Sequence, residues 1–159
     1  MLKVRTVGMI EKSAKNNPVV VAQEDVKNGI FYTVDSGNAV LPVEGSESEK
    51  QSKDLYVAIN TGSGDARYSG DIVIKKGEYL NSYLVKAWEG QELVFDESHI
   101  NYGESQDYSK INENETKLVA DTDGNLKIST DVSNYGIYFV VVKKLQFNGN
   151  AVSAKIVLN

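Results

Sequence analysis

The stretch GIYFVVVKKLQFNGNAVSAKIVLN, residues Gly136–Asn159, decides the fold class of this chain. Two runs rich in β-branched residues flank Asn148-Gly149, a dipeptide that readily takes the positive φ angles of a tight turn. The stretch therefore predicts a β-hairpin. Its first run, IYFVVV, is apolar at every position, which is typical of a central strand that is covered on both faces.

Similar short runs recur along the chain, bounded by glycine, asparagine and aspartate. This spacing predicts an all-β protein, an antiparallel β-barrel or β-sandwich of about 8–10 short strands with little helix. A length of 159 residues fits a single β-rich domain over residues 1–159. The predicted strands are Pro18–Ala22, Gly29–Val34, Leu55–Asn60, Asp71–Lys75, Glu92–Asp96, Lys117–Ala120, Asn125–Thr130, Gly136–Leu145 and Ala151–Leu158.

Two polar stretches predict surface loops, at residues 43–54 and as an insertion at about residues 101–115. The second stretch is long for a loop without structure of its own, which indicates a function or an ordering partner. Its Tyr102 and Tyr108 are therefore candidate partner-binding residues.

The segment YLNSYLVKAW, Tyr79–Trp88, fits two secondary structures. Its apolar residues follow helical spacing, but its tyrosine and valine content and the strand-like flanks favour β-structure, with a turn at Glu89-Gly90. Large aromatic side chains such as Trp88 bring much apolar area to a core. A core role is the preferred interpretation of Trp88, Tyr79 and Tyr83, and an interface role is the alternative.

Composition restricts the function classes. The chain has no cysteine, which removes disulfides and thiolate metal sites. Its formal net charge of −5 disfavours nonspecific binding of nucleic acid. We find no apolar run of a length that would span a membrane and no signal peptide, so we expect no membrane partner and synthesis in the cytoplasm.

No catalytic, cofactor-binding or metal-binding set is predicted. His99 is the sole histidine, so we interpret it as an ordinary strand-end or surface residue. The DTDGN run, Asp121–Asn125, resembles the start of a calcium loop, but its glycine stands at the wrong position, and a tight hairpin turn is the better interpretation. The glycines of residues 61–70 precede another strand instead of a phosphate-binding helix. We therefore expect no small-molecule substrate.

Three segments carry a family resemblance: VRTVGMIEKSAKNNPVVVAQEDVKNGIFYTVD (Val4–Asp35), DIVIKKGEYLNSYLVKAWEGQELVFD (Asp71–Asp96) and IYFVVVKKLQF (Ile137–Phe147). They resemble small capsid decoration (head cement) or minor capsid proteins of tailed bacteriophages that infect Firmicutes. The resemblance implies a virion protein on the capsid surface that binds the major capsid protein and stabilises its lattice. Trimers at local threefold positions are one arrangement that it implies.

The N-terminal arm or edge strand, about residues 1–17, is the first candidate for docking on such a lattice. Its basic residues make it locally positive in an acidic chain; they are Lys3, Arg5, Lys12 and Lys15. An ordinary edge strand with solvated lysines is an equally good interpretation. Two other functions stay open: a β-barrel or sandwich module that recognises carbohydrate or peptide through exposed tyrosines, and a hydrolase built around His99 and nearby acids.

Overall fold

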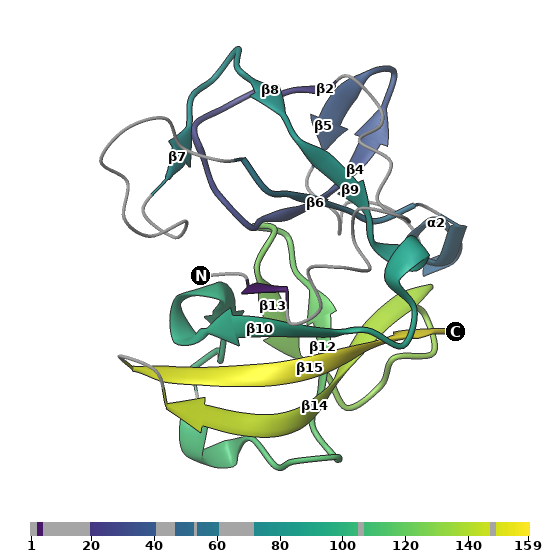
Figure 1. Cartoon of the computed structure of the whole chain (residues 1–159). Coiled ribbons are helices and arrows are strands. Elements are labelled where there is room, and N and C mark those ends of the chain that lie inside the picture. The colour runs from purple at the N-terminus through teal and green to yellow at the C-terminus, as the bar shows by residue number, and fades with distance from the viewer. Residues whose placement is uncertain are drawn as a thin grey trace.

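The computed structural model describes residues 3–4, 20–40, 47–52, 54–60, 72–104, 107–146 and 149–159. These residues are mostly β, and their sheets form a nearly closed barrel and a half-barrel (Figure 1). The predicted all-β class is thereby confirmed. The short helical segments are α2 (Glu47–Ser52), η2 (Val85–Trp88), η3 (Glu97–His99) and η4 (Tyr108–Lys110). No helix within the described residues is long and apolar enough to cross a membrane.

The larger sheet has seven strands. In spatial order they are β1 (Lys3–Val4), β10 (Glu92–Asp96), β15 (Asn150–Leu158), β14 (Ile137–Gln146), β12 (Lys117–Ala120), β13 (Leu126–Ile128) and β11 (Ile100–Asn101). All neighbours are antiparallel except β11 and β13, which run parallel. The hairpin predicted at the C-terminal side is confirmed as β14 and β15, which pair over almost their whole length around a turn at Gly149 (φ 136).

The smaller sheet has six strands. In order they are β8 (Tyr79–Leu80), β2 (Val20–Val21), β5 (Asn38–Val40), β4 (Phe31–Asp35), β6 (Tyr56–Ala58) and β9 (Ser82–Leu84). Its two end strands, β8 and β9, are separated in the sequence by Asn81 alone. One bent segment therefore pairs with β2 at its start and with β6 at its end, and brings the two edges of the sheet together. A separate ribbon joins β3 (Val26–Lys27) to β7 (Val73–Ile74).

The described residues form two hydrophobic clusters. The larger one lies under the seven-stranded sheet, where the rings of Phe31, Phe95 and Phe139 meet with centroids 5.2–6.0 Å apart. Phe31 belongs to β4, so the six-stranded sheet contributes to the core of its neighbour. The smaller cluster surrounds Tyr32 and Leu80. Because the larger core draws on both sheets, each sheet depends on the other for burial of its apolar face.

Each predicted strand has a counterpart among the described residues, while Pro18, Val19 and Asp71 lie outside them, and most of the differences lie between the strands. Strand β5 was not predicted, although Ser36 and Gly37 both take positive φ and turn β4 directly into it. The predicted loop at residues 43–54 contains α2, whose Glu, Lys and Gln are good helix formers. The segment Tyr79–Trp88 is strand up to Leu84 and a 3-10 helix from Val85 onward, so the preferred β interpretation holds for its first part only.

Strand β14 is central, as predicted, since β15 and β12 flank it. It is not fully covered on both faces. Phe139 and Val141 are buried on the inner face, whereas Tyr138 and Val140 are half-buried on the other. Val140 pairs with Lys117 on one side and Lys155 on the other, and these cationic neighbours mark the face that meets water.

Candidate functional site

The predicted basic docking segment is described at Lys3 only. Lys3 and its neighbour Val4 form β1, which pairs with β10 as the end strand of the seven-stranded sheet. The edge-strand interpretation is therefore correct for these two residues. Arg5, Lys12 and Lys15 lie outside the described residues, and the docking role of this segment remains a prediction.

Tyr108 is fixed to the C-terminal hairpin. Its hydroxyl lies 3.0 Å from the carbonyl oxygen of Leu145 and 2.9 Å from that of Ala151, and it shares its single hydrogen between them. Leu145 and Ala151 face each other across β14 and β15, so one tyrosine ties both strands together. The Lys144 ammonium lies 4.5 Å from the centre of the Tyr108 ring and donates to the Tyr108 carbonyl at 2.9 Å.

Tyr102 also faces inward. It packs against the larger core, and its hydroxyl is buried without a hydrogen-bond partner among the described residues. Burial is the main reason that the pKa of Tyr102 rises to about 12. The sequence predicted that both tyrosines lie exposed on a polar loop. This was wrong, because the apolar area of each ring is buried against the core or the hairpin.

Within this stretch, residues 107–115 are accordingly a strap attached to the hairpin. The Asn114 amide donates to the Val141 carbonyl at 2.6 Å, and Glu113 accepts from the Lys144 amide at 2.7 Å. We call residues 107–115 the tyrosine strap. Among the described residues, the strongly exposed aromatic side chain is Tyr79, at 66%, so the preferred core interpretation was wrong for this residue. The alternating burial of β8 explains this, because Leu80 faces the core and Tyr79 points the other way.

His99 lies at the boundary between the two sheets, and its side chain is buried. It sits between β10 and β11, as a strand-end residue should, but it is only 3% exposed, so the surface interpretation was wrong. Its Nε2 lies 3.1 Å from the Asn28 carbonyl of the β3–β4 turn, and its Nδ1 lies 3.1 Å from Asp96 Oδ1. Since a carbonyl can only accept, Nε2 carries the hydrogen.

Two influences on the His99 ring oppose each other. Burial lowers the pKa of His99 to about 4, whereas the neighbouring carboxylate of Asp96 favours the charged ring. The Asp96 side chain is 36% exposed, so water weakens its attraction, while the ring itself is almost fully desolvated. Burial is the larger of these influences, so the pKa of His99 lies below its usual value.

Asn28 extends the contact with His99 into the six-stranded sheet. Its side chain accepts from the Asn60 amide at 2.7 Å and donates to the Asn60 carbonyl at 3.1 Å. The Asn60 side chain in turn accepts from the Asn81 amide at 2.7 Å and donates to the Tyr79 carbonyl at 2.9 Å. This polar chain runs from the seven-stranded sheet to the break between β8 and β9.

The residues around His99 are not arranged as a nucleophile relay. A relay needs the serine and the acid on opposite ring nitrogens. Here Ser98 Oγ and Asp96 Oδ1 both lie near Nδ1, at 3.4 and 3.1 Å, and Ser98 also donates its hydroxyl hydrogen to Asp96. Nε2 is directed at a buried backbone carbonyl. The cluster therefore serves to place the ring, and the geometry gives Ser98 no general base.

The DTDGN run forms the predicted hairpin turn between β12 and β13. The buried Asp121 carboxylate accepts from the Asp123 and Asn125 amides at 2.9 Å each, so it is used in shaping the turn. The Gly124 carbonyl accepts from the Phe31 amide at 2.8 Å, which attaches this turn to the six-stranded sheet. The described residues contain no group of three or more His, Asp or Glu side chains that could hold a metal ion.

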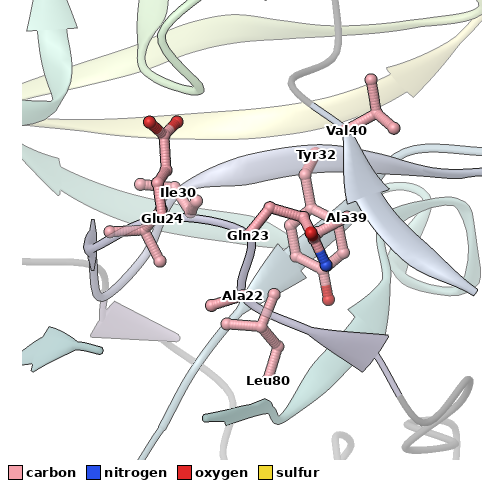
Figure 2. Close-up of a pocket in the computed structure, with 9 residues that line it drawn as sticks. Ala22, Gln23, Glu24, Ile30, Tyr32, Ala39, Val40 and Leu80 are labelled. Atoms are coloured by element: carbon pink, nitrogen blue, oxygen red, sulfur yellow. The ribbon is translucent and has the colours of Figure 1, made fainter. Parts of the chain in front are cut away.

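A small cavity lies in the six-stranded sheet between the turn after β2 and strands β4 and β5 (Figure 2). Apolar side chains line most of it, among them Ala22, Ile30 and Leu80, and its volume is about 30 Å³. Such a volume holds about two water molecules, whereas pockets for small-molecule ligands measure roughly 300–1,000 Å³. Gln23 lies beside this cavity and donates to Asn38 Oδ1 at 2.9 Å.

Comparisons with family models, with curated proteins and with solved structures found no match to this chain. The function is therefore inferred from the geometry of the residues and from the resemblance of the sequence.

Proposed function

We propose that this protein is a structural component of a phage virion, which decorates the capsid surface and stabilises it by binding the major capsid protein lattice. The main support is that the polar candidate residues hold parts of the fold together. Tyr108 ties two strands together, His99 joins two sheets, and Asp121 shapes a turn, so each holds the fold in place.

Hydrogen bonds that hold strands and sheets together suit a mechanical role. A protein that spans neighbouring capsid subunits has to resist local opening, and regions with many buried contacts and satisfied hydrogen bonds open least. The long hairpin of β14 and β15, held by the tyrosine strap, is a rigid element of this kind. A lattice also multiplies a modest interface, because binding at one subunit raises the effective concentration at the next. A trimer at local threefold positions fits this arrangement.

Two surfaces are candidates for the capsid contact. The first is the basic N-terminal segment that begins at β1, whose charge opposes the net charge of −5 of the whole chain. The second is the segment from Val73 to Tyr79, whose two exposed apolar side chains are 47% and 66% exposed. We favour the first surface, because an acidic capsid would attract it from a distance.

The test uses undecorated heads assembled from a phage major capsid protein. Purified protein is mixed with the heads, which are then sedimented and imaged by electron cryomicroscopy. We expect regularly spaced added density, and weaker binding by the Lys3→Glu/Arg5→Glu variant, most visibly at low salt. The Lys143→Glu/Lys155→Glu variant changes the charge equally at exposed positions outside both candidate surfaces and should bind normally. Protein that stays in the supernatant at high concentration would refute the proposal.

One observation favours a second candidate, a module that binds carbohydrate or peptide. Tyr79 offers an exposed ring, which is a common stacking surface for ligands. Tyr102 and Tyr108 serve this function less well, since their hydroxyls are buried or bonded to the hairpin. A glycan and peptide array probed with the wild type and with Tyr79→Ser decides the matter. Loss of binding in the Tyr79→Ser variant would support this second function, and unchanged binding would contradict it.

A further inference from the structure

Helix α2 connects the two sheets. It lies in the connection between β5 and β6 of the six-stranded sheet, and it contacts the loop between β13 and β14 of the seven-stranded sheet. The Gln51 side chain donates to the Ser133 carbonyl, and the Lys50 ammonium lies 5.9 Å from the centre of the Tyr135 ring. A Cβ added to Gly136 would lie 2.6 Å from the Gln51 carbonyl oxygen. The helix therefore meets the second sheet through polar groups and backbone.

The loop that receives α2 is held in shape by contacts of its own. We call residues 131–136 the platform. The Asn159 side chain donates to the carbonyls of Val132 and Tyr135, and the Asn159 amide donates to the Gly136 carbonyl at 3.1 Å. These bonds come from the end of β15 and involve no residue of α2. The platform therefore keeps its shape when the helix leaves it.

Helix α2 has few means of staying folded by itself. Its sequence, ESEKQS, has no apolar side chain, and the two hydrophobic clusters of the described residues include none of its residues. It is six residues long, whereas isolated helices shorter than about 12–15 residues are marginal in water. The helical form of α2 therefore depends on its contacts with the rest of the molecule, and a segment that leaves the platform should lose its helical form as well.

We propose that α2 is a reversible clasp between the two sheets. In the closed state, α2 is helical and covers the platform. In the open state, α2 has left the platform and is no longer helical, while both sheets stay folded because their apolar clusters contain none of its side chains. Opening frees the Ser133 carbonyl and the Tyr135 ring. A partner that binds the platform must therefore displace α2 first.

The first measurement is native-state hydrogen exchange of the wild type, followed by NMR at a series of low urea concentrations. The Gln51 amide, whose partner in an α-helix is the carbonyl four residues earlier, should have a protection factor at least about a hundredfold lower than the Val141 amide of β14. Its exchange should also respond little to urea, because opening of the clasp exposes little surface. Equal protection and equal urea dependence of the two amides would overturn the proposal, since α2 would then open only when the whole protein unfolds.

The second measurement compares variants by NMR. The atoms nearest to a Cβ at position 136 belong to Gln51, and the backbone of Gly136 has an ordinary φ, so Gly136→Ala acts on the clasp alone. The helical Cα chemical shifts of Lys50 and Gln51 should disappear in this variant, while the shifts of β14 stay in place.

Gln51→Ala keeps a good helix former but removes the hydrogen bond to Ser133, so opening of α2 should become about two- to tenfold more frequent. Asn134→Ala, in the same loop but in none of these contacts, should leave α2 unchanged. Helical shifts that persist in Gly136→Ala would overturn the proposal, as would a Gly136→Ala protein in which the shifts of β14 are lost together with those of α2.

Discussion

The hydroxyl groups of Tyr108, in the tyrosine strap, and of Tyr102, which precedes the strap, allow a matched test, because the same chemical change should have opposite results. Tyr108→Phe removes the hydroxyl that serves the carbonyls of Leu145 and Ala151. A hydrogen bond contributes about 0.5–1.5 kcal/mol net, and a buried group left without its partner costs about 1–3 kcal/mol. Ala151 is buried, but Leu145 is half-buried and its carbonyl regains water, so we expect a loss of about 1–2 kcal/mol.

Tyr102→Phe removes a buried hydroxyl that has no partner among the described residues. The folded state then no longer carries the cost of desolvating that group, and the ring keeps its packing against the core. We expect stability to be unchanged or to rise by up to about 1 kcal/mol. In a protein of this size, about 1 kcal/mol corresponds to roughly 2–4 °C in Tm.

Urea unfolding at neutral pH, followed by circular dichroism, measures both variants. Lys144→Met is a useful third variant, because it keeps the aliphatic stem over the Tyr108 ring but removes the charge and the hydrogen bond to the Tyr108 carbonyl. It should destabilise by about 0.5–1 kcal/mol. If Tyr108→Phe proves as stable as the wild type while Tyr102→Phe loses 1 kcal/mol or more, the description of the strap is incorrect.

Three further changes test other parts of the fold. Gly136→Ala should cost about 1–3 kcal/mol in calorimetry, because its Cβ would lie 2.6 Å from the backbone oxygen of Gln51, and Gln51→Ala should not restore the loss. Asp121→Ala should cost about 1–3 kcal/mol in urea unfolding, whereas Asp123→Ala, at an exposed position of the same turn, should stay within about 0.5 kcal/mol. Burial raises the pKa of Tyr32 from 10.0 to about 12. The contribution of the protonated hydroxyl to stability should therefore be complete below pH 10 and lost between pH 10 and 12. In urea unfolding at alkaline pH, Tyr32→Phe should not show this loss of stability.

The sequence predicted the strands whose own residues carry a pattern. Strand β10 is an apolar run between two acidic residues, and the β14–β15 hairpin combines two β-branched runs with an Asn-Gly turn, so both were placed to within one or two residues. The short strand β5 has no such pattern. It is a strand because the Ser36-Gly37 turn folds it back onto β4, and the Ser-Gly dipeptide was the signal that could have revealed it.

The candidate site was harder to predict, because its burial is decided by partners far away in the sequence. The carbonyl that covers His99 belongs to Asn28, 71 positions earlier. The carbonyls that hold Tyr108 come 37 and 43 positions later. A polar stretch around each residue correctly indicated irregular backbone, but irregular backbone can still be packed against a core. Trp88 was placed correctly in the core, since it packs on Tyr83 and is buried.

The order of the strands in the larger sheet has a consequence for how the chain folds as it is made. Strand β15 follows all the others of this sheet in the sequence, yet it lies between β10 and β14 (Figure 1). Strands β1 and β10 therefore cannot be connected to β14 within the sheet until β15 has left the ribosome. Until then, the edges of β10 and β14 that β15 will cover can pair with other chains. The pairing of β10 with β15 is slow, because these strands are far apart in the sequence. Nascent chains arrested before residue 150 should be sensitive to protease along β10, and completion of β15 should protect both neighbours in a single step.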